Sequence, residues 1–217
     1  MEKVKKVLLV VFVMMFFIGI ILVTDFGKMK KYQNNEVTDL ANLGYRQMQT
    51  GDLVSGKVDY VLDTVAEEYE TKFGIRTSDD STKLYYIISL PNSYAVYETS
   101  NKEEYDTLDK ICNETWDYLN SEDGSAPAPT SSLMIQGEVK KMDDKVAGYF
   151  KDWFKEQADF SDEDFEKNTE VYMISRTKFD GFQRSVYTGI GLAAVAAAKG
   201  LSLIHISEPP RLDVISY

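Results

Sequence analysis

The side chains that could take part in chemistry are almost all carboxylates. The chain has 35 Asp and Glu residues but one histidine, His205, and one cysteine, Cys112. His205 lies in a C-terminal segment, residues 201–217, that we expect not to be native, so Ser-His-Asp and Cys-His catalytic groups cannot form from the other residues. Zinc sites built from Cys and His are excluded within one chain for the same reason, and the phosphate-binding patterns GxxxxGKS and GxxxxGKT have no match. The sequence therefore predicts no catalytic residue, no bound metal and no cofactor.

Two acidic clusters are the candidate sites that remain. In VAEEYE, Glu67, Glu68 and Glu70 are typical of a solvated face, and a glycosidase-like carboxylate pair is the open alternative. The run DFSDEDFE, residues 159–166, lacks the central glycine that a calcium loop needs. Ser161 followed by acidic residues is typical of a helix N-terminus, where carboxylates interact favourably with the helix dipole. We therefore interpret the second cluster as a helix start rather than a metal site.

Four tyrosines on a predicted β-hairpin form a possible binding surface: Tyr85, Tyr86, Tyr94 and Tyr97. Because side chains alternate along a strand, Tyr85 and Tyr86 point to opposite faces of the sheet. One set of rings could therefore be exposed, and aromatic side chains are common in binding sites. Packing in the core and cross-strand pairing are the alternative explanation.

The elements that would position these residues are a sheet and two amphipathic helices. Apolar and β-branched runs between turn residues predict strands, and apolar residues at helical spacing predict helices, the first with Asn101 as its cap. The hairpin turns at residues 91–93, and a Ser/Pro/Ala linker spans residues 121–132. The predicted strands are 53–63, 83–90, 94–99, 133–143 and 171–175, and the predicted helices lie around 105–119 and 146–154.

Two of the predicted strands share a pattern. LVSGKVDYVLD and LMIQGEVKKMD align Gly56 with Gly137 and Val58 with Val139. Small curved sheets often contain a strand that bends at a glycine, which is one explanation of this pattern. The alternative explanation is two ordinary strands with one glycine each. The fold class that we predict is α+β: a membrane-anchored domain, residues 51–179, with a curved, mostly antiparallel sheet and two amphipathic helices, flanked by transmembrane helices.

A long apolar segment near the N-terminus predicts a membrane anchor. Residues 7–23 read VLLVVFVMMFFIGIILV, close to the roughly 17–25 residues that span a bilayer. A secretory signal peptide would have a shorter apolar core and a small-residue cleavage site, and a surface helix would need a polar face. We therefore expect a basic tail over 1–6, a transmembrane helix over 7–24 and a juxtamembrane helix over 28–50.

A second apolar segment, residues 183–200, predicts the start of another membrane helix. It is rich in Ala and Gly, and Gly189 and Gly191 could support close helix–helix contact. Its glycines do not follow a strand of a βαβ unit, so a dinucleotide site is not expected. Lys199 interrupts the segment, and LSLIHISEP beyond it resembles the translation of a sequencing adaptor. We expect residues 201–217 to be a non-native tail that truncates the helix.

The charge balance bears on partners and location. The formal net charge of −11 argues against nucleic acid, which binds basic surfaces, so the lipid bilayer and a protein or envelope component are the expected partners. Lysines flank the first apolar segment on both sides, within residues 3–6 and 28–31, and leave its orientation open by the positive-inside rule. Basic residues before the second segment favour a cytoplasmic domain. The very short basic tail favours an extracytoplasmic domain at the cell membrane, which is the location that we expect.

Segments spread over the domain resemble an uncharacterised family. They are LVSGKVDYVLDTVAEEYE, FGIRTS, YYIISLP, LDKICNETWDYLN, IQGEVKKMDD and YFKDWF. The sequence over residues 51–182 is similar to small bacterial membrane proteins, largely from gut-dwelling Gram-positive bacteria, whose domain has no known function. The resemblance implies two membrane helices that bracket the domain, and it implies no catalytic or binding residues. The chain departs from this pattern by ending inside the second helix.

Three functions are compatible with these observations. A non-enzymatic binding or scaffold module held beside the membrane fits the lack of a catalytic group and the aromatic hairpin, and this is the function that we predict. An accessory subunit of a membrane transport or secretion complex, docked through Gly189 and Gly191, is the first alternative. A carboxylate-based cell-envelope enzyme that uses Glu67, Glu68 or Glu70 is the second.

Overall fold

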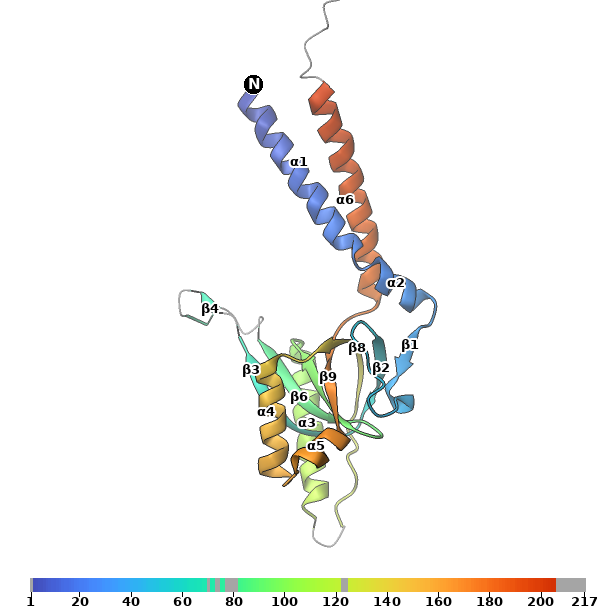
Figure 1. Cartoon of the computed structure of the whole chain (residues 1–217), viewed down its shortest axis with the longest axis vertical. Helices are drawn as coiled ribbons and strands as arrows, with labels where there is room; N and C mark the ends of the chain where they lie inside the picture. The colour runs from blue at the N-terminus through green and yellow to red at the C-terminus, as the bar shows by residue number, and fades with distance from the viewer. Residues whose placement is uncertain (1, 70, 73–74, 77–81, 122–124, 206–217) are drawn as a thin grey trace, which may run out of the picture. The chain divides into compact units, whose positions relative to one another are not determined.

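The chain folds into two units, seen in a computed structural model that describes residues 2–69, 71–72, 75–76, 82–121 and 125–205. The first unit comprises residues 1–30 and 179–217, and the second comprises residues 31–178. The elements of each unit are labelled in Figure 1.

Two long helices make up the first unit: α1 (Glu2–Val23) and α6 (Asp180–His205) (Figure 1). One helical stretch of the described residues, Lys6–Gln33, is long and apolar enough to cross a membrane by its length and composition. It includes most of α1 and the short helix α2 (Phe26–Gln33). The predicted second apolar segment is also helical, but Lys199 lies within α6 and does not interrupt it.

Glycines bring α1 and α6 close together. A methyl group on Gly19 or on Gly189 would lie 2.7 Å from the carbonyl oxygen of the other residue, so neither position accepts a side chain without movement. Ser185 Oγ donates a hydrogen bond to the Leu22 carbonyl oxygen, 3.3 Å away. Gly191 faces open space instead. Gly189 therefore makes a close helix contact within this chain, whereas Gly191 does not.

The second unit is built on an open sheet of seven strands in the order β1-β2-β8-β9-β7-β6-β3. The pairs β1–β2 and β7–β9 are parallel and the other neighbours are antiparallel, which confirms the predicted mostly antiparallel α+β fold. Two short strands, β4 (Thr71–Lys72) and β5 (Ile75–Arg76), pair separately. The strands of the main sheet are β1 (Val37–Asp39), β2 (Leu53–Val58), β3 (Val61–Glu68), β6 (Lys83–Ser89), β7 (Tyr94–Thr99), β8 (Leu133–Lys141) and β9 (Thr169–Arg176).

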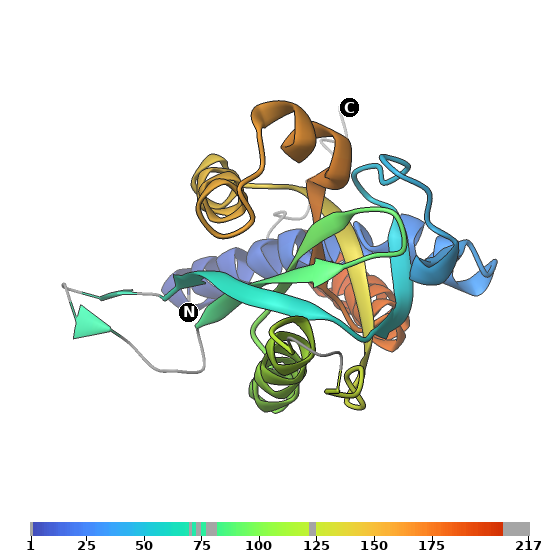
Figure 2. The same ribbon diagram turned by 90° about the horizontal axis from the view of Figure 1, so that it is seen from below.

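Helices cover both faces of this sheet (Figure 2). Helix α3 (Lys102–Leu119) packs Leu108 and Ile111 into the core on one face, as its helical apolar spacing predicts. Helix α4 (Asp144–Gln157) packs Phe150 and Phe154 against the opposite face. The short helix α5 (Asp162–Asn168) follows α4 and leads into β9. The hairpin of β6 and β7 and the two amphipathic helices are confirmed.

The predicted juxtamembrane helix over residues 28–50 differs from the structure. Helix α2 ends at Gln33, and Asn35 then adopts a φ of 57°, which a continuing helix does not allow. Strand β1 and a single 3₁₀ turn (Leu40–Asn42) follow, and Leu40 is buried in the core on the α3 face. The apolar residues that predicted a helix therefore belong to a segment that packs onto the sheet. As a result, the folded unit starts at residue 31 rather than at residue 51.

The predicted strand over residues 53–63 is two strands. Asp59 and Tyr60 separate β2 from β3, and each strand pairs with a different neighbour, β8 and β6 respectively. Gly56 and Gly137 sit in the β2–β8 ladder without a shift of register, so neither forms a β-bulge. Both allow close approach instead, because a methyl group on Gly56 would lie 2.7 Å from Leu40 Cβ.

Replacing Gly137 by alanine is expected to destabilise the second unit by about 1–3 kcal/mol, the usual cost of overpacking. The added methyl would lie 2.5 Å from Ile174 Cγ2 and 2.8 Å from the Ser175 carbonyl oxygen, and the backbone atom cannot move away alone. Gly148→Ala is the matched control, since Gly148 lies in α4 with open space around it and alanine there should stabilise the helix. Denaturant unfolding of both variants measures this, and equal midpoints would contradict the packing.

Candidate functional site

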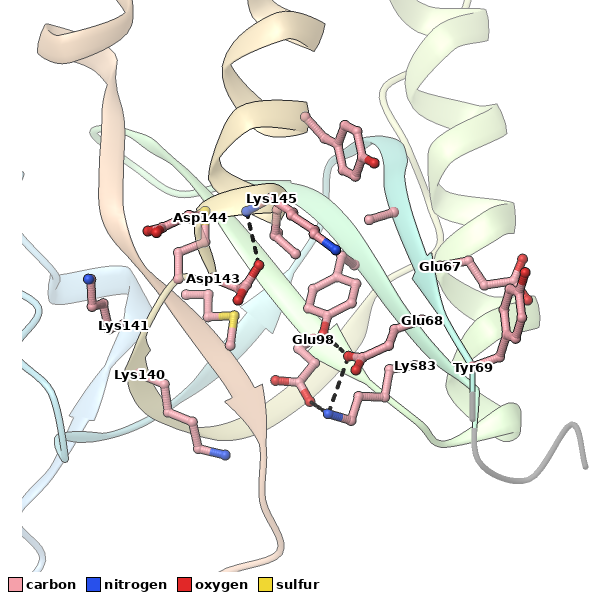
Figure 3. A pocket seen from close by; sticks show the side chains of 16 residues that line it. Glu67, Glu68, Tyr69, Lys83, Glu98, Lys140, Lys141, Asp143, Asp144 and Lys145 are labelled. Carbon is pink, nitrogen blue, oxygen red and sulfur yellow. Dashed lines mark hydrogen bonds and ion pairs between the residues drawn. The ribbon is translucent and has the colours of Figure 1, made fainter. Parts of the chain in front are cut away.

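A groove of about 920 Å³ crosses the α4 face of the sheet beside the start of α4 (Figure 3). It is lined by strands that are consecutive neighbours, β3, β6, β7, β9 and β8, and by the first turns of α4. Because neighbouring strands lie about 4.8 Å apart, the groove runs about 19 Å from β3 to β8. It is therefore long enough for a chain-like ligand.

The floor of the groove is a cluster of paired charges. Lys83 Nζ lies 3.5 Å from Glu68 Oε2 and 3.5 Å from Glu98 Oε1, and the Tyr85 hydroxyl donates a 2.8 Å hydrogen bond to Glu68 Oε2. Strand register creates the cluster, because Lys83 is the cross-strand partner of Glu68, and Tyr85 is the partner of Glu98. Figure 3 shows the side chains of Glu68, Lys83 and Glu98 converging from three strands.

The electrostatics of the floor follow from this pairing. Burial lowers the pKa of Lys83, but the charges of Glu98 and Glu68 outweigh it and hold the pKa above its ordinary value. Burial, with a further contribution from the hydrogen bond to Glu68, raises the pKa of Tyr85, so its hydroxyl stays protonated at neutral pH. The floor thus presents one ammonium group between two carboxylates.

The two ends of the groove carry opposite charges. Glu67 and Glu68 lie at the β3 end, and Lys140 and Lys141 lie at the β8 end (Figure 3). Lys140 Nζ donates a 3.0 Å hydrogen bond to the Ser175 hydroxyl. Because this hydroxyl is neutral, the contact does not compensate the positive charge of Lys140.

Helix α4 begins directly at the groove. Asp143 is its N-cap, and the Asp143 carboxylate accepts a 2.9 Å hydrogen bond from the Lys145 backbone N–H. Asp144 and the side chain of Lys145 also line the groove. Over the part of the chain that the structure describes, no ion pair engages the ammonium group of Lys141 or of Lys145.

The carboxylates singled out in VAEEYE are partly brought together here. Glu67 and Glu68 line the groove, whereas Glu70 lies outside the described residues. A glycosidase-like pair needs one carboxyl group that is protonated and donates to the leaving group. Lys83 instead lies between Glu68 and Glu98 and pairs with both, an arrangement that favours charge pairing over acid catalysis.

The four tyrosines do not form an exposed surface. Tyr86 and Tyr97 are fully buried on the α3 face, where their hydroxyls donate to Asp109 (3.0 Å) and Glu104 (2.9 Å). Tyr94 is half-buried against the Phe154 ring. Tyr85 is also buried, but it lines the groove from below. The alternation of Tyr85 and Tyr86 between two faces is confirmed, while an aromatic binding surface on the hairpin is replaced by core packing.

The acidic run DFSDEDFE is a helix start, as predicted. The Ser161 hydroxyl accepts from the Asp164 backbone N–H, and the Asp164 carboxylate accepts from the Ser161 backbone N–H, which together form a capping box. In the described residues no group of three or more His, Cys, Asp and Glu side chains is placed to hold a metal ion. Cys112 is half-buried beside the Leu62 carbonyl, and burial raises the pKa of its thiol to about 11.

These features define an α+β sheet domain with a charged groove, joined to an apolar N-terminal helix. The chain belongs to the family described as a domain of unknown function (DUF8577), whose family model matches residues 1–206. The match spans both units, and it confirms the expected membership of an uncharacterised domain family. No curated protein and no solved structure matches the chain.

Proposed function

We propose that this protein is a non-enzymatic binding module that is held at a cell membrane and captures its ligand in the groove. The observation that carries the proposal is the groove itself, an open trough that combines paired and unpaired charges with an apolar wall. Ligand sites commonly combine a few placed polar groups with apolar contact area in this way. The lysine that pairs with both floor carboxylates supports binding rather than acid–base chemistry.

Membrane attachment is the second part of the proposal. The helical stretch Lys6–Gln33 supports an anchor by its length and apolar composition, and many of its large apolar side chains are exposed. We place α6 in the bilayer beside α1, because the glycine contact between them is typical of membrane helices. An extracytoplasmic position of the domain is part of the proposal, and the resemblance to small bacterial membrane proteins favours a bacterial membrane.

The accessory-subunit alternative makes a different use of α6. Gly189 is occupied by its contact with Gly19, which leaves Gly191 as the glycine able to receive a partner helix. A transport or secretion complex would therefore engage the Gly191 side of α6, not the groove.

Site-specific photo-crosslinking tests the proposal. A benzophenone side chain in place of Tyr149, which lines the groove and is 54% exposed, is expected to yield a discrete adduct in membranes of the source cells. The same side chain in place of Tyr118 on α3 is the control, because Tyr118 is 39% exposed on the opposite face of the sheet.

Three results of this experiment are informative. An adduct from position 149 alone would support the groove as the binding site. Adducts from neither position would contradict a binding role for the groove. Adducts only from a crosslinker placed at Gly191 would favour the accessory-subunit function instead.

A further inference from the structure

We infer that the groove binds an extended peptide segment with a cationic group at the β3 end and an acidic group at the β8 end. This inference rests on the proposed binding function and adds the chemical class of the ligand. It follows from the order of charges along the groove, from which charges are already paired, and from the length of the groove.

The strand order sets the order of charges. Glu67 and Glu68 come from β3 at the edge of the sheet, Lys83 and Glu98 from β6 and β7 in the middle, and Lys140 from β8 beyond β9. Figure 3 shows the carboxylates of β3 and the lysines of β8 on opposite sides of the central pair. The groove is therefore dipolar along its length, and a ligand with the reverse polarity is favoured by electrostatic complementarity.

The ion pairs within the groove leave negative charge in excess at the β3 end and positive charge in excess at the β8 end. Glu68 and Glu98 share one lysine, so Lys83 compensates only one of the two negative charges. At the other end, three lysines (Lys140, Lys141 and Lys145) outnumber the two carboxylates of Asp143 and Asp144. Lys140 contacts the neutral Ser175 hydroxyl, and among the described residues Lys141 and Lys145 have no ion-pair partner. The β3 end thus retains capacity for a cation, and the β8 end retains capacity for a carboxylate.

The dimensions favour an extended peptide. A groove of about 19 Å matches about six residues of extended chain, at roughly 3.3 Å per residue. Its wall includes Ala66, Met142, Val146 and Met173, which offer contact area for side chains between the charged groups. Nucleic acids and other polyanions are disfavoured because carboxylates line the floor and both ends of the groove.

A peptide array tests the inference directly. Hexapeptides of Gly and Ser that carry one Lys and one Glu, at every pair of positions, are probed with the purified full-length protein at low salt. We expect signal when the two charges are four or five positions apart and little signal when they are adjacent. Exposed ion pairs contribute modestly to binding, so the preferred spacing should bind several-fold more strongly than the adjacent spacing.

Charge variants locate the two ends. Lys141→Gln/Lys145→Gln should remove the spacing preference by weakening the site for the peptide glutamate, and Glu67→Gln/Glu68→Gln should do so by weakening the site for the peptide lysine. Lys57→Gln/Lys110→Gln changes the net charge as much as the first variant, but it alters exposed lysines outside the groove, so it should keep the preference.

The outcomes separate this inference from the proposed function. No binding to the array, or binding that ignores charge spacing, would overturn the inference. If the Tyr149 photo-adduct still forms, the groove remains a binding site for a ligand of another class. If neither experiment gives binding at the groove, the proposed function fails as well.

Discussion

Replacing Glu104 by alanine is expected to lower the free energy of unfolding of the second unit by about 3 kcal/mol, the lower end of the cost of breaking a buried ion pair by removing one partner, because this pair is partly buried. The Glu104 carboxylate accepts from Arg176 Nε (2.5 Å), Thr99 Oγ1 (2.7 Å), Tyr97 Oη (2.9 Å) and Asn101 Nδ2 (3.2 Å). The side chains of Glu104 and Arg176 are 14% and 22% exposed, so water cannot fully replace the lost acceptor. Alanine would leave an uncompensated guanidinium and donors without an acceptor.

Denaturant unfolding with a neighbouring control tests this expectation. Glu103→Ala removes an exposed carboxylate from the same first turn of α3 and should change stability little. A loss for Glu104→Ala no larger than for Glu103→Ala would contradict the role of the cluster.

The pH dependence of stability should change as well. Burial raises the pKa of Glu104, but the hydrogen bonds from Arg176, Thr99, Asn101 and Tyr97 outweigh it and leave the pKa below its ordinary value. A carboxyl group whose pKa is lower in the folded state stabilises the fold above its unfolded pKa, and that contribution is lost as the pH falls through the folded pKa. Glu104→Gln should therefore lose less stability than the native chain between neutral and acidic pH.

Replacing Glu170 by alanine is expected to cost about 3 kcal/mol, because a buried hydroxyl and a partly buried backbone N–H would lose a charged acceptor. Glu170 is 2% exposed, and its Oε1 accepts from the Ser93 hydroxyl (2.8 Å) and from the Arg46 backbone N–H (3.0 Å). These bonds hold Arg46, which has a φ of 53°, against the start of β9. The Glu170 Oε2 atom is buried and has no hydrogen-bond partner in the described structure.

The unpartnered oxygen leads to a second, sharper expectation. Glu170→Gln keeps an acceptor for both donors and removes a buried charge, so it should destabilise much less than Glu170→Ala. Glu166→Ala is the control, since Glu166 is exposed and contributes its backbone carbonyl to Tyr45 and Arg46, which alanine retains. Equal unfolding midpoints for the alanine and glutamine variants at Glu170 would contradict this account.

The elements predicted from the sequence are those set by local interactions. The hairpin around residues 91–93 and the capping box at Ser161 depend on neighbours within a few residues, and both are present. Strand β1 was missed because its three residues are strand only through parallel pairing with β2. The parallel pairing of β7 with β9 joins residues more than seventy positions apart, such as Tyr94 and Thr169, and no local pattern indicates it.

The candidate site was predicted only in part for the same reason. Glu67 and Glu68 stood out as a cluster, but Lys83 and Glu98 become their neighbours only through the register of β3, β6 and β7. Lys83 and Glu68 are a cross-strand pair of the β3–β6 ladder, so a correct register between these two strands would have supplied this signal. The tyrosines suggested a surface because sequence alternation shows which residues share a face but not that helices cover both faces.

The central claim is that the groove is an open binding site on a membrane-held domain that faces out of the cytoplasm. It is tested most directly by labelling Tyr149→Cys in intact cells with a membrane-impermeant maleimide, followed by an alkaline wash of the membranes. The native chain supplies the background, because the Cys112 thiol is half-buried with a pKa raised to about 11 and should react slowly. We expect rapid labelling of the variant in intact cells, with the labelled protein retained in the washed membranes. Labelling only after lysis, or recovery of the protein in the wash, would contradict it.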